Sequence, residues 1–304
     1  MKNISLIFLF SLLFVFHSCN HGSDDLNLNN SGDGVVNNGN GTGNTSGNNG
    51  NSNNNQNNPV GVDGEITLYR VDGEDIFKIS DYLVSGQDLM YQQDIQEHQK
   101  LWRLVKKIVP LNYRDKIGEF LIYNGSVTET NGLSAQINND SSKWKLGIAI
   151  NYSNDDQQKL IYTIVHEFGH ILTLNDDQIN TSIRESNCTT FYTDLGCSKS
   201  DSYLNQFQNQ FWSDIWDSFI TAQFEGVMGI QSFYTTYIDH FFILNSANNP
   251  KEDIADVFAI FVTREEASSG NSIKEQKIEF MYSFSELVSL RNYIRTNLGS
   301  SSGG

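Results

Sequence analysis

Two histidines and a glutamate near the middle of the chain have the types and the spacing needed for metal chemistry. In His166-Glu167-Phe168-Gly169-His170 the histidines are four residues apart, so on an α-helix both imidazoles lie on one face. Two neutral imidazoles placed in this way can bind one Zn²⁺ at about 2.0–2.1 Å. Glu167 can take a proton from a water that such an ion activates. The alternative is a chance match on a core helix, but only 6 of 304 residues are histidine, which favours a metal site.

The residues around this motif predict the helix that would position it. Apolar residues recur at roughly helical spacing over 160–172. Asn154 is the expected N-cap, and Asp155 and Asp156 suit the first turn.

A hydrolytic zinc site needs a third protein ligand, with the fourth position left open. Asp176 is one candidate, because it stands at the last position of the compact pattern His-Glu-x-x-His-x-x-Gly-x-x-His/Asp. Thr173 replaces the Gly of that pattern, and a β-branched residue resists the sharp turn required there. Asp176 is therefore the second choice, and we interpret it as a loop residue.

Glu252 is the preferred third ligand. Asn249 and Pro250 predict the start of a second helix, whose apolar stripe extends to residue 261. Glu252 and Asp256 share one face of that helix, so Glu252 could complete the metal site while Asp256 accepts a hydrogen bond from the second ring nitrogen of His166. The alternative is an acidic first turn that the helix dipole stabilises.

The two motifs together resemble the gluzincin metallopeptidases, of which thermolysin is the best-known member. The form Asn-Pro-x-Glu-Asp-x-Ala-Asp at 249–256 is more similar still to a group of zinc metallopeptidases inferred among bacterial surface lipoproteins. The resembling stretch spans residues 144–263. It implies an α+β, zincin-like fold with a small, mostly antiparallel sheet, an active-site helix and a helical C-terminal subdomain. It also implies a Zn²⁺ cofactor, a peptide or protein substrate, and Glu167 as the general base.

The resemblance carries two further expectations. The strand over 144–151, directly before the motif helix, should be the sheet edge that pairs with the substrate backbone. A Tyr or His should stabilise the oxyanion, and we rank Tyr237 first, with Tyr234 and His240 as alternatives. In the relatives this Tyr lies closer to the ligand Glu, so residues 242–248 are interpreted as an insertion.

The start of the chain resembles a bacterial lipoprotein signal. Residues 4–16 are apolar and follow Lys2, which is typical of a signal peptide over 1–18. Cys19 comes directly after a small residue and would become the lipidated N-terminus. Asp24 and Asp25 resemble an export tag for surface lipoproteins, although linker acidity explains them equally well. An ordinary secretory signal with an incidental Cys is the alternative.

Residues 19–60 are dominated by Asn, Gly and Ser and predict a disordered tether. Residues 61–300 are then one domain, anchored in a bacterial outer membrane through the N-terminal lipid and facing outward. A net charge of −16 argues against a nucleic-acid partner.

The two remaining cysteines and several short patterns complete the expected domain. In an oxidising compartment Cys188 and Cys197 could form a disulfide, and two free thiols are the alternative. Alternating or apolar runs predict strands, a long periodic stretch at 88–109 predicts one helix, and aromatic residues at 207–220 predict a core-facing helix. The strands are expected at 65–71, 76–79, 120–123, 133–137 and 144–151.

A non-catalytic surface binding lipoprotein on the same scaffold is the alternative function.

Overall fold

The computed structural model describes residues 17–18, 58–265 and 270–299. The proposed lipidation site Cys19, the signal up to residue 16 and the tether up to residue 57 lie outside the described residues. For residues 17 and 18 only the backbone is described.

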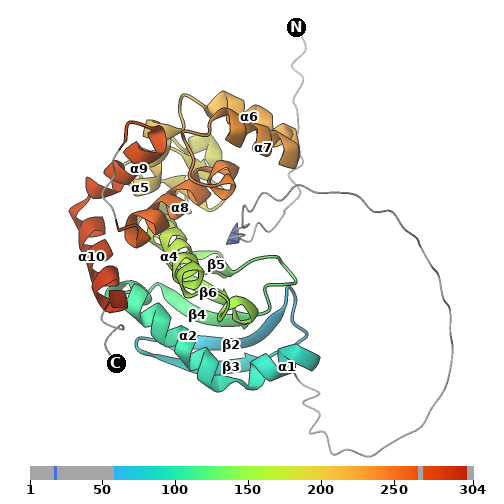
Figure 1. Cartoon of the computed structure of the whole chain (residues 1–304). Helices are drawn as coiled ribbons and strands as arrows, with labels where there is room; N and C mark the ends of the chain where they lie inside the picture. The colour runs from blue at the N-terminus through green and yellow to red at the C-terminus, as the bar shows by residue number, and fades with distance from the viewer. Residues whose placement is uncertain (1–16, 19–57, 266–269, 300–304) are drawn as a thin grey trace, which may run out of the picture.

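One sheet forms the lower half of the molecule in Figure 1. Its strand order is β1-β5-β6-β4-β2-β3, and all neighbours are antiparallel except the parallel pair β4 and β6. This arrangement confirms the expected α+β class with a mostly antiparallel sheet. The strands are β1 (His17–Ser18), β2 (Glu65–Asp72), β3 (Asp75–Asp81), β4 (Ile117–Tyr123), β5 (Gly132–Ile137) and β6 (Asp140–Ala149).

The strand that precedes the motif helix is not at the sheet edge, so that prediction is wrong. β6 lies between β4 and β5. Asn138 and Asn139 both have positive φ, 54° and 60°, as the two-residue turn of a hairpin requires. This turn places β5 antiparallel on the outer side of β6. The backbone of His17–Ser18 pairs with the outer edge of β5, opposite Ser134 and Leu133.

Helices α2 and α4 lie together against one face of the sheet (Figure 1). The single helix expected over 88–109 is broken at Asp94, whose side chain accepts a hydrogen bond from the Glu97 amide and caps a new helix. The motif helix also begins later than expected, because Asp156 rather than Asn154 caps it. These elements are α1 (Gly86–Gln93), α2 (Ile95–Ile108), α3 (Leu111–Arg114), the 3-10 turn η1 (Ile150–Tyr152) and α4 (Gln157–Leu174).

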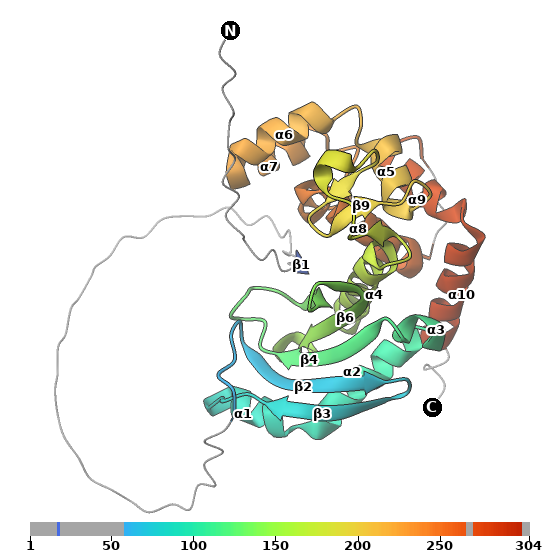
Figure 2. The same ribbon diagram turned by 180° about the vertical axis from the view of Figure 1, so that it is seen from behind.

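A helical half follows α4 and forms the upper part of the molecule in Figures 1 and 2. Within the described residues, this half starts with a small sheet of order β7-β9-β8 and continues through six helices. The elements are β7 (Ile179–Asn180), η2 (Glu185–Asn187), β8 (Tyr192–Thr193), β9 (Gly196–Ser198), α5 (Tyr203–Phe211), α6 (Trp216–Phe224), α7 (Gly226–Thr236), η3 (Leu244–Asn248), α8 (Pro250–Thr263), α9 (Ile273–Tyr282) and α10 (Ser285–Gly299).

Two features of this half bear on the sequence predictions. The aromatic stretch forms two helices, α5 and α6, rather than one, and most of its large side chains are buried as expected, with Trp216 and Ile220 only partly buried. Cys188 and Cys197 are joined by a disulfide. Across the described parts of the chain, every helix is too short or too polar to cross a membrane.

Helix α8 packs against α4 and joins the helical half to the sheet half. At their closest approach Gly169 faces Ala255, and a Cβ on Gly169 would lie only 3.2 Å from the Ala255 Cα. The C-terminal helix α10 fixes the far end of α8, since Arg291 and Arg295 donate to the last carbonyls of that helix. The first turn of α8 is thereby positioned beside the middle of α4.

Candidate metal centre

Three side chains from α4 and α8 converge in the buried interior. The Nε2 atoms of His166 and His170 are 3.0 Å apart, and the Glu252 Oε2 lies 3.4 Å and 3.5 Å from them. Both imidazoles are fully buried and Glu252 is nearly so. These three residues also form the one cluster of metal-ligating side chains found within the described residues.

The spacing of these three atoms fits a metal ion. Donors about 2.0–2.1 Å from a tetrahedral zinc lie about 3.3–3.4 Å from one another. The three observed separations bracket that value. Burial lowers the pKa of His170, so its imidazole is neutral near pH 7 and can offer a lone pair. The donor set of two imidazoles and one carboxylate is the one used by catalytic zinc sites of the His₂Glu kind.

Local sequence explains how Glu252 reaches this position. The Asn249 side chain accepts hydrogen bonds from the amides of Lys251 and Glu252, and Pro250 occupies the first helical position. Glu252 therefore lies in the first turn of α8, as the sequence predicted. The missing side chain of Gly169 allows that turn to come close to α4.

Asp256 lies behind His166, one turn further along α8. Its Oδ1 is 2.7 Å from the His166 Nδ1 and accepts a hydrogen bond from the Tyr162 hydroxyl at 2.9 Å. Its Oδ2 accepts from the Ser246 hydroxyl at 2.9 Å. A carboxylate at Nδ1 keeps the proton on that nitrogen, which leaves the Nε2 lone pair directed at the cluster.

Glu167 is fully buried beside the cluster, and its carboxylate oxygens accept no hydrogen bond of standard geometry from the described residues, although the Ser134 hydroxyl acts on the pKa of this carboxyl. Burial, together with the nearby Glu252 carboxylate, raises the pKa of Glu167 to about 8, although the adjacent His166 opposes the shift. A buried carboxyl without a well-formed hydrogen bond is costly unless something else occupies the site. The position is suited to a ligand, a water or an ion.

Other predicted site residues lie elsewhere. Asp176 follows α4 in a loop, where its carboxylate contacts Lys116 at 2.5 Å and remains partly exposed. Tyr237 follows α7, and its hydroxyl donates to the Ser218 hydroxyl on α6 at 2.9 Å. Its ring packs on Phe233 and His240. The oxyanion role of Tyr237 stays a prediction.

Three polar residues around the cluster were not found from the sequence. Tyr162 stands four residues before His166, stacks near its ring and binds Asp256. Asn245 donates to the Glu252 Oε2 at 2.9 Å, and Ser246 donates to Asp256. The spacing of Tyr162 was a usable signal, because residues four apart share a helix face. The other two lie in η3, within the stretch that we interpreted as an insertion.

Comparison with known proteins gives one structural likeness to report. The crystal structure of a putative zinc-binding metallo-peptidase from Bacteroides caccae aligns with a TM-score of 0.35 and 17% sequence identity, over 72% of this chain and 81% of that chain. No family model matches the sequence. No curated protein matches it either.

Proposed function

We propose that this chain is a gluzincin-type zinc metalloendopeptidase in which His166, His170 and Glu252 hold the ion and Glu167 is the general base. The observation that carries the proposal is the convergence of three donor atoms, 3.0–3.5 Å apart, beside a buried carboxylate that accepts no hydrogen bond of standard geometry from the described residues. A structural zinc site usually has four protein ligands, whereas a catalytic site leaves one position open. Three donors with an adjacent carboxylate match the catalytic kind.

A zinc ion bound there would act as a Lewis acid toward a peptide carbonyl and would lower the pKa of a water. The residues of the chain transfer the proton and position the His166 ring. Glu167 takes the proton from the attacking water and gives it to the leaving amine. With no ion bound, burial raises the pKa of Glu167 to about 8, and the charge of a bound Zn²⁺ would favour the ionised carboxylate, which is the form that can accept this proton. Asp256 and Tyr162 hold the His166 ring in place while this happens.

Strand β5 is proposed as the element that aligns the substrate backbone. It borders α4, and Gly132 at its start contacts the Glu167 side chain. Its outer edge can accept an antiparallel strand, as the pairing with the backbone of His17–Ser18 illustrates. A peptide added at this edge would gain main-chain hydrogen bonds and would run past the general base.

The test measures zinc and proteolysis on the same samples. Purified protein should contain one zinc per chain and cleave casein or a peptide library, and a chelator should abolish cleavage. Glu167→Gln should keep its zinc and lose cleavage by about 100-fold or more. Glu225→Gln, an exposed residue between α6 and α7, is the matched control and should change nothing. Absence of zinc, or full activity in Glu167→Gln, would refute the proposal. A zinc-loaded chain that cleaves nothing would favour the binding lipoprotein instead.

We also propose that Cys19 is lipidated and anchors the domain in an outer membrane, facing outward. The support is the sequence alone, namely the apolar run over 4–16 after Lys2 and the small residue Ser18 directly before Cys19. Metabolic labelling with a palmitate analogue tests it. Label should be incorporated and should disappear in Cys19→Ala, and protease added to intact cells should remove the domain. Label in the variant would contradict the assignment.

A further inference from the structure

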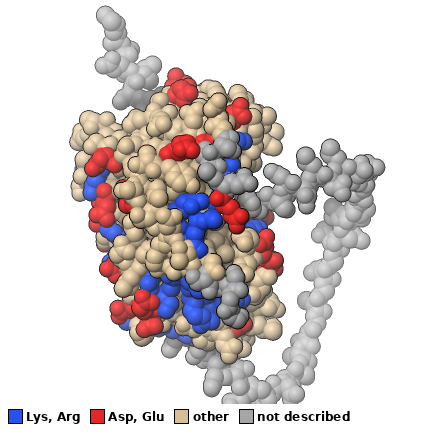
Figure 3. All heavy atoms as spheres, turned by 60° about the vertical axis from the view of Figure 1, so that its left-hand side comes forward, with Lys and Arg blue, Asp and Glu red and all other residues tan. Residues whose placement is uncertain are grey.

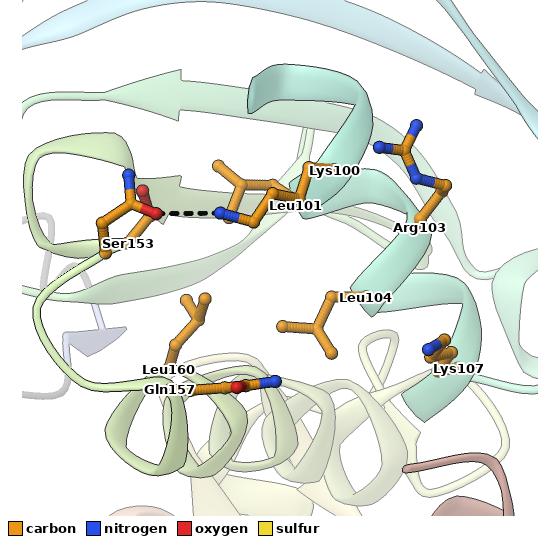
Figure 4. Close-up of a pocket in the computed structure, with 9 residues that line it drawn as sticks. Lys100, Leu101, Arg103, Leu104, Lys107, Ser153, Gln157 and Leu160 are labelled. Atoms are coloured by element: carbon orange, nitrogen blue, oxygen red, sulfur yellow. Dashed lines mark hydrogen bonds between the residues drawn. The ribbon is translucent and has the colours of Figure 1, made fainter. Parts of the chain in front are cut away.

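A pocket lies between α2 and the start of α4, away from the cluster formed by His166, His170 and Glu252. Its volume is about 410 Å³, within the range of small-molecule sites. Figure 4 shows its lining residues, which come from α2, from the segment joining β6 to α4 and from the first turn of α4. They are Lys100, Leu101, Arg103, Leu104, Lys107, Ser153, Asn154, Gln157 and Leu160. None of them belongs to the metal cluster or contacts it through the hydrogen bonds described above.

Three of the residues that line this pocket are leucines. Leu104 on α2 and Leu160 on α4 point toward one another across it (Figure 4). Leu101 lies beside them and is almost fully buried. A ligand that fills this space would remove aliphatic surface from water, which favours an aliphatic group over a purely ionic ligand.

The rim of the pocket is cationic. Lys100, Arg103 and Lys107 recur at intervals of three and four, so one face of α2 presents all three. This concentration is notable in a chain with a net charge of −16. Lys and Arg side chains also gather in the lower part of the face drawn in Figure 3, whereas acidic ones are more scattered. A positive rim beside these leucines complements a negatively charged head on an aliphatic tail.

Two of the acidic groups near the pocket, Glu97 and Asp156, have partners within the protein. Glu97 pairs with Lys100 at 3.1 Å and accepts a hydrogen bond from Ser153. Asp156 caps α4 by accepting from the Gln158 and Lys159 amides. Arg103 is exposed and forms no ion pair with a carboxylate in the stretches that the structure describes. Its guanidinium is thus available for an added anion.

Neutral hydrogen-bond donors complete the opposite wall. The Asn154 Oδ1 accepts from the Lys100 amine at 2.8 Å, the dashed line in Figure 4, which leaves the amide nitrogen of Asn154 to donate. The Gln157 side chain also lines this wall. Amide, guanidinium and ammonium donors around one opening suit an oxyanion such as a carboxylate or a phosphate.

We propose that this pocket binds a small amphiphilic anion, with the oxyanion held by Arg103 and Lys107 and the aliphatic chain placed between Leu104 and Leu160. The shared chemistry is a carboxylate or phosphate head on an unbranched chain. The proposal is independent of the peptidase assignment, because binding is measured without any substrate turnover.

Calorimetric titration of the full chain with decanoate tests the pocket. Decanoate should bind saturably, whereas acetate, which lacks the chain, and decyltrimethylammonium, which lacks the negative charge, should not. The double variant Arg103→Gln with Lys107→Gln should weaken decanoate binding about tenfold, as expected for loss of two partly exposed charged contacts. Lys106→Gln, a neighbour on α2 that pairs with Glu74 outside the pocket, should stay within about twofold of the parent.

Further measurements distinguish a soluble single-chain ligand from a membrane lipid and control for misfolding. Decyl phosphate should compete with decanoate, and vesicles containing phosphatidylglycerol should not displace it, because the pocket takes a single chain. Leu104→Ala should weaken decanoate binding while the thermal midpoint and zinc content verify folding. The proposal would be overturned if Lys106→Gln weakened decanoate binding as much as the double variant does, or if acetate bound as tightly as decanoate. It would also be overturned if vesicles alone displaced decanoate, or if decanoate showed no saturable binding below about 1 mM.

Discussion

The His166 Nδ1 lies 2.7 Å from the Asp256 Oδ1, although 90 positions separate the two residues in the sequence. Both side chains are fully buried, and the carboxylate is itself held by Tyr162 and Ser246. This chain of contacts fixes the rotation of the ring and the nitrogen that bears the proton. The His166 nitrogen that faces His170 and Glu252 is therefore set by a residue outside this cluster.

Replacement of Asp256 by Asn should weaken zinc binding by about 10–100-fold, because the amide cannot hold the Nδ1 proton as a carboxylate does. Competition with a fluorescent chelator measures the affinity. Asp217→Asn, at the exposed start of α6, is the control and should bind zinc like the parent. Unchanged affinity in Asp256→Asn would show that the contact does not tune the site.

Gly132 should be needed for the position of Glu167. A Cβ at residue 132 would lie 2.6 Å from the Thr163 Cγ2 and 2.8 Å from the Glu167 Cγ. Gly132→Ala should therefore move β5 or Glu167, with a loss of about 1–3 kcal/mol in unfolding free energy. Peptide turnover should fall about tenfold or more while zinc remains bound. Gly299→Ala, where nothing lies within 4 Å, is the control. Normal turnover in Gly132→Ala would contradict the proposed contact.

The sequence was most informative where local chemistry determines structure. The four-residue spacing of His166 and His170 and the Asn249-Pro250 helix start depend only on neighbouring residues, and both helices form as expected. The buried aromatic residues followed from hydrophobic pattern in the same way, whereas the α+β class was implied by the family resemblance.

Features set by distant contacts were not predictable from single-chain patterns. The resemblance placed β6 at the sheet edge, and only the return of β5 along the outer side of β6 makes β6 an inner strand. The break at Asp94 lies inside an otherwise continuous helical pattern. There the Asp94 side chain caps a new helix, so the first helix does not continue. Asn245 and Ser246 carry no motif, and their role beside Glu252 and Asp256 arises from how η3 packs on α8.

His98 should make stability depend on pH. Its Nδ1 lies 2.7 Å from the Tyr69 hydroxyl and its Nε2 lies 2.9 Å from the Tyr91 carbonyl, an arrangement that suits a neutral ring donating from Nε2. Burial lowers the pKa of His98 below its ordinary value. The unfolded chain therefore binds more protons as the pH falls through about 6.5, so the unfolding free energy decreases from there toward the folded pKa.

Urea unfolding between about pH 5 and pH 8, in the presence of a chelator, measures this effect. His98→Gln keeps a donor and an acceptor but does not titrate, so its stability should decrease less steeply at low pH. The remaining histidines and carboxylates contribute to both proteins, and the difference isolates His98. Parallel curves for the two proteins would exclude a contribution from this residue.

Lys277 and Asp253 form a fully buried ion pair next to the metal cluster, and we expect it to hold the first turn of α8. The Lys277 Nζ lies 2.5 Å from the Asp253 Oδ2, which also accepts from the Trp212 indole at 2.7 Å. The ammonium also lies 4.5 Å from the centre of the Phe241 ring. Burial lowers the pKa of Lys277 and raises that of Asp253 to about 6, so each charge depends on the other.

Lys277→Met should cost about 3–5 kcal/mol of unfolding free energy, because it leaves the Asp253 charge buried without its partner. Adding Asp253→Asn should restore part of that loss, since the amide is neutral and can still accept from Trp212. Lys274→Met, on the same helix but only half-buried, should stay within about 1 kcal/mol of the parent. A double-mutant cycle by urea unfolding gives the coupling energy. If the double variant were no more stable than Lys277→Met, the loss would come from packing around the lysine stem rather than from the unpaired carboxylate.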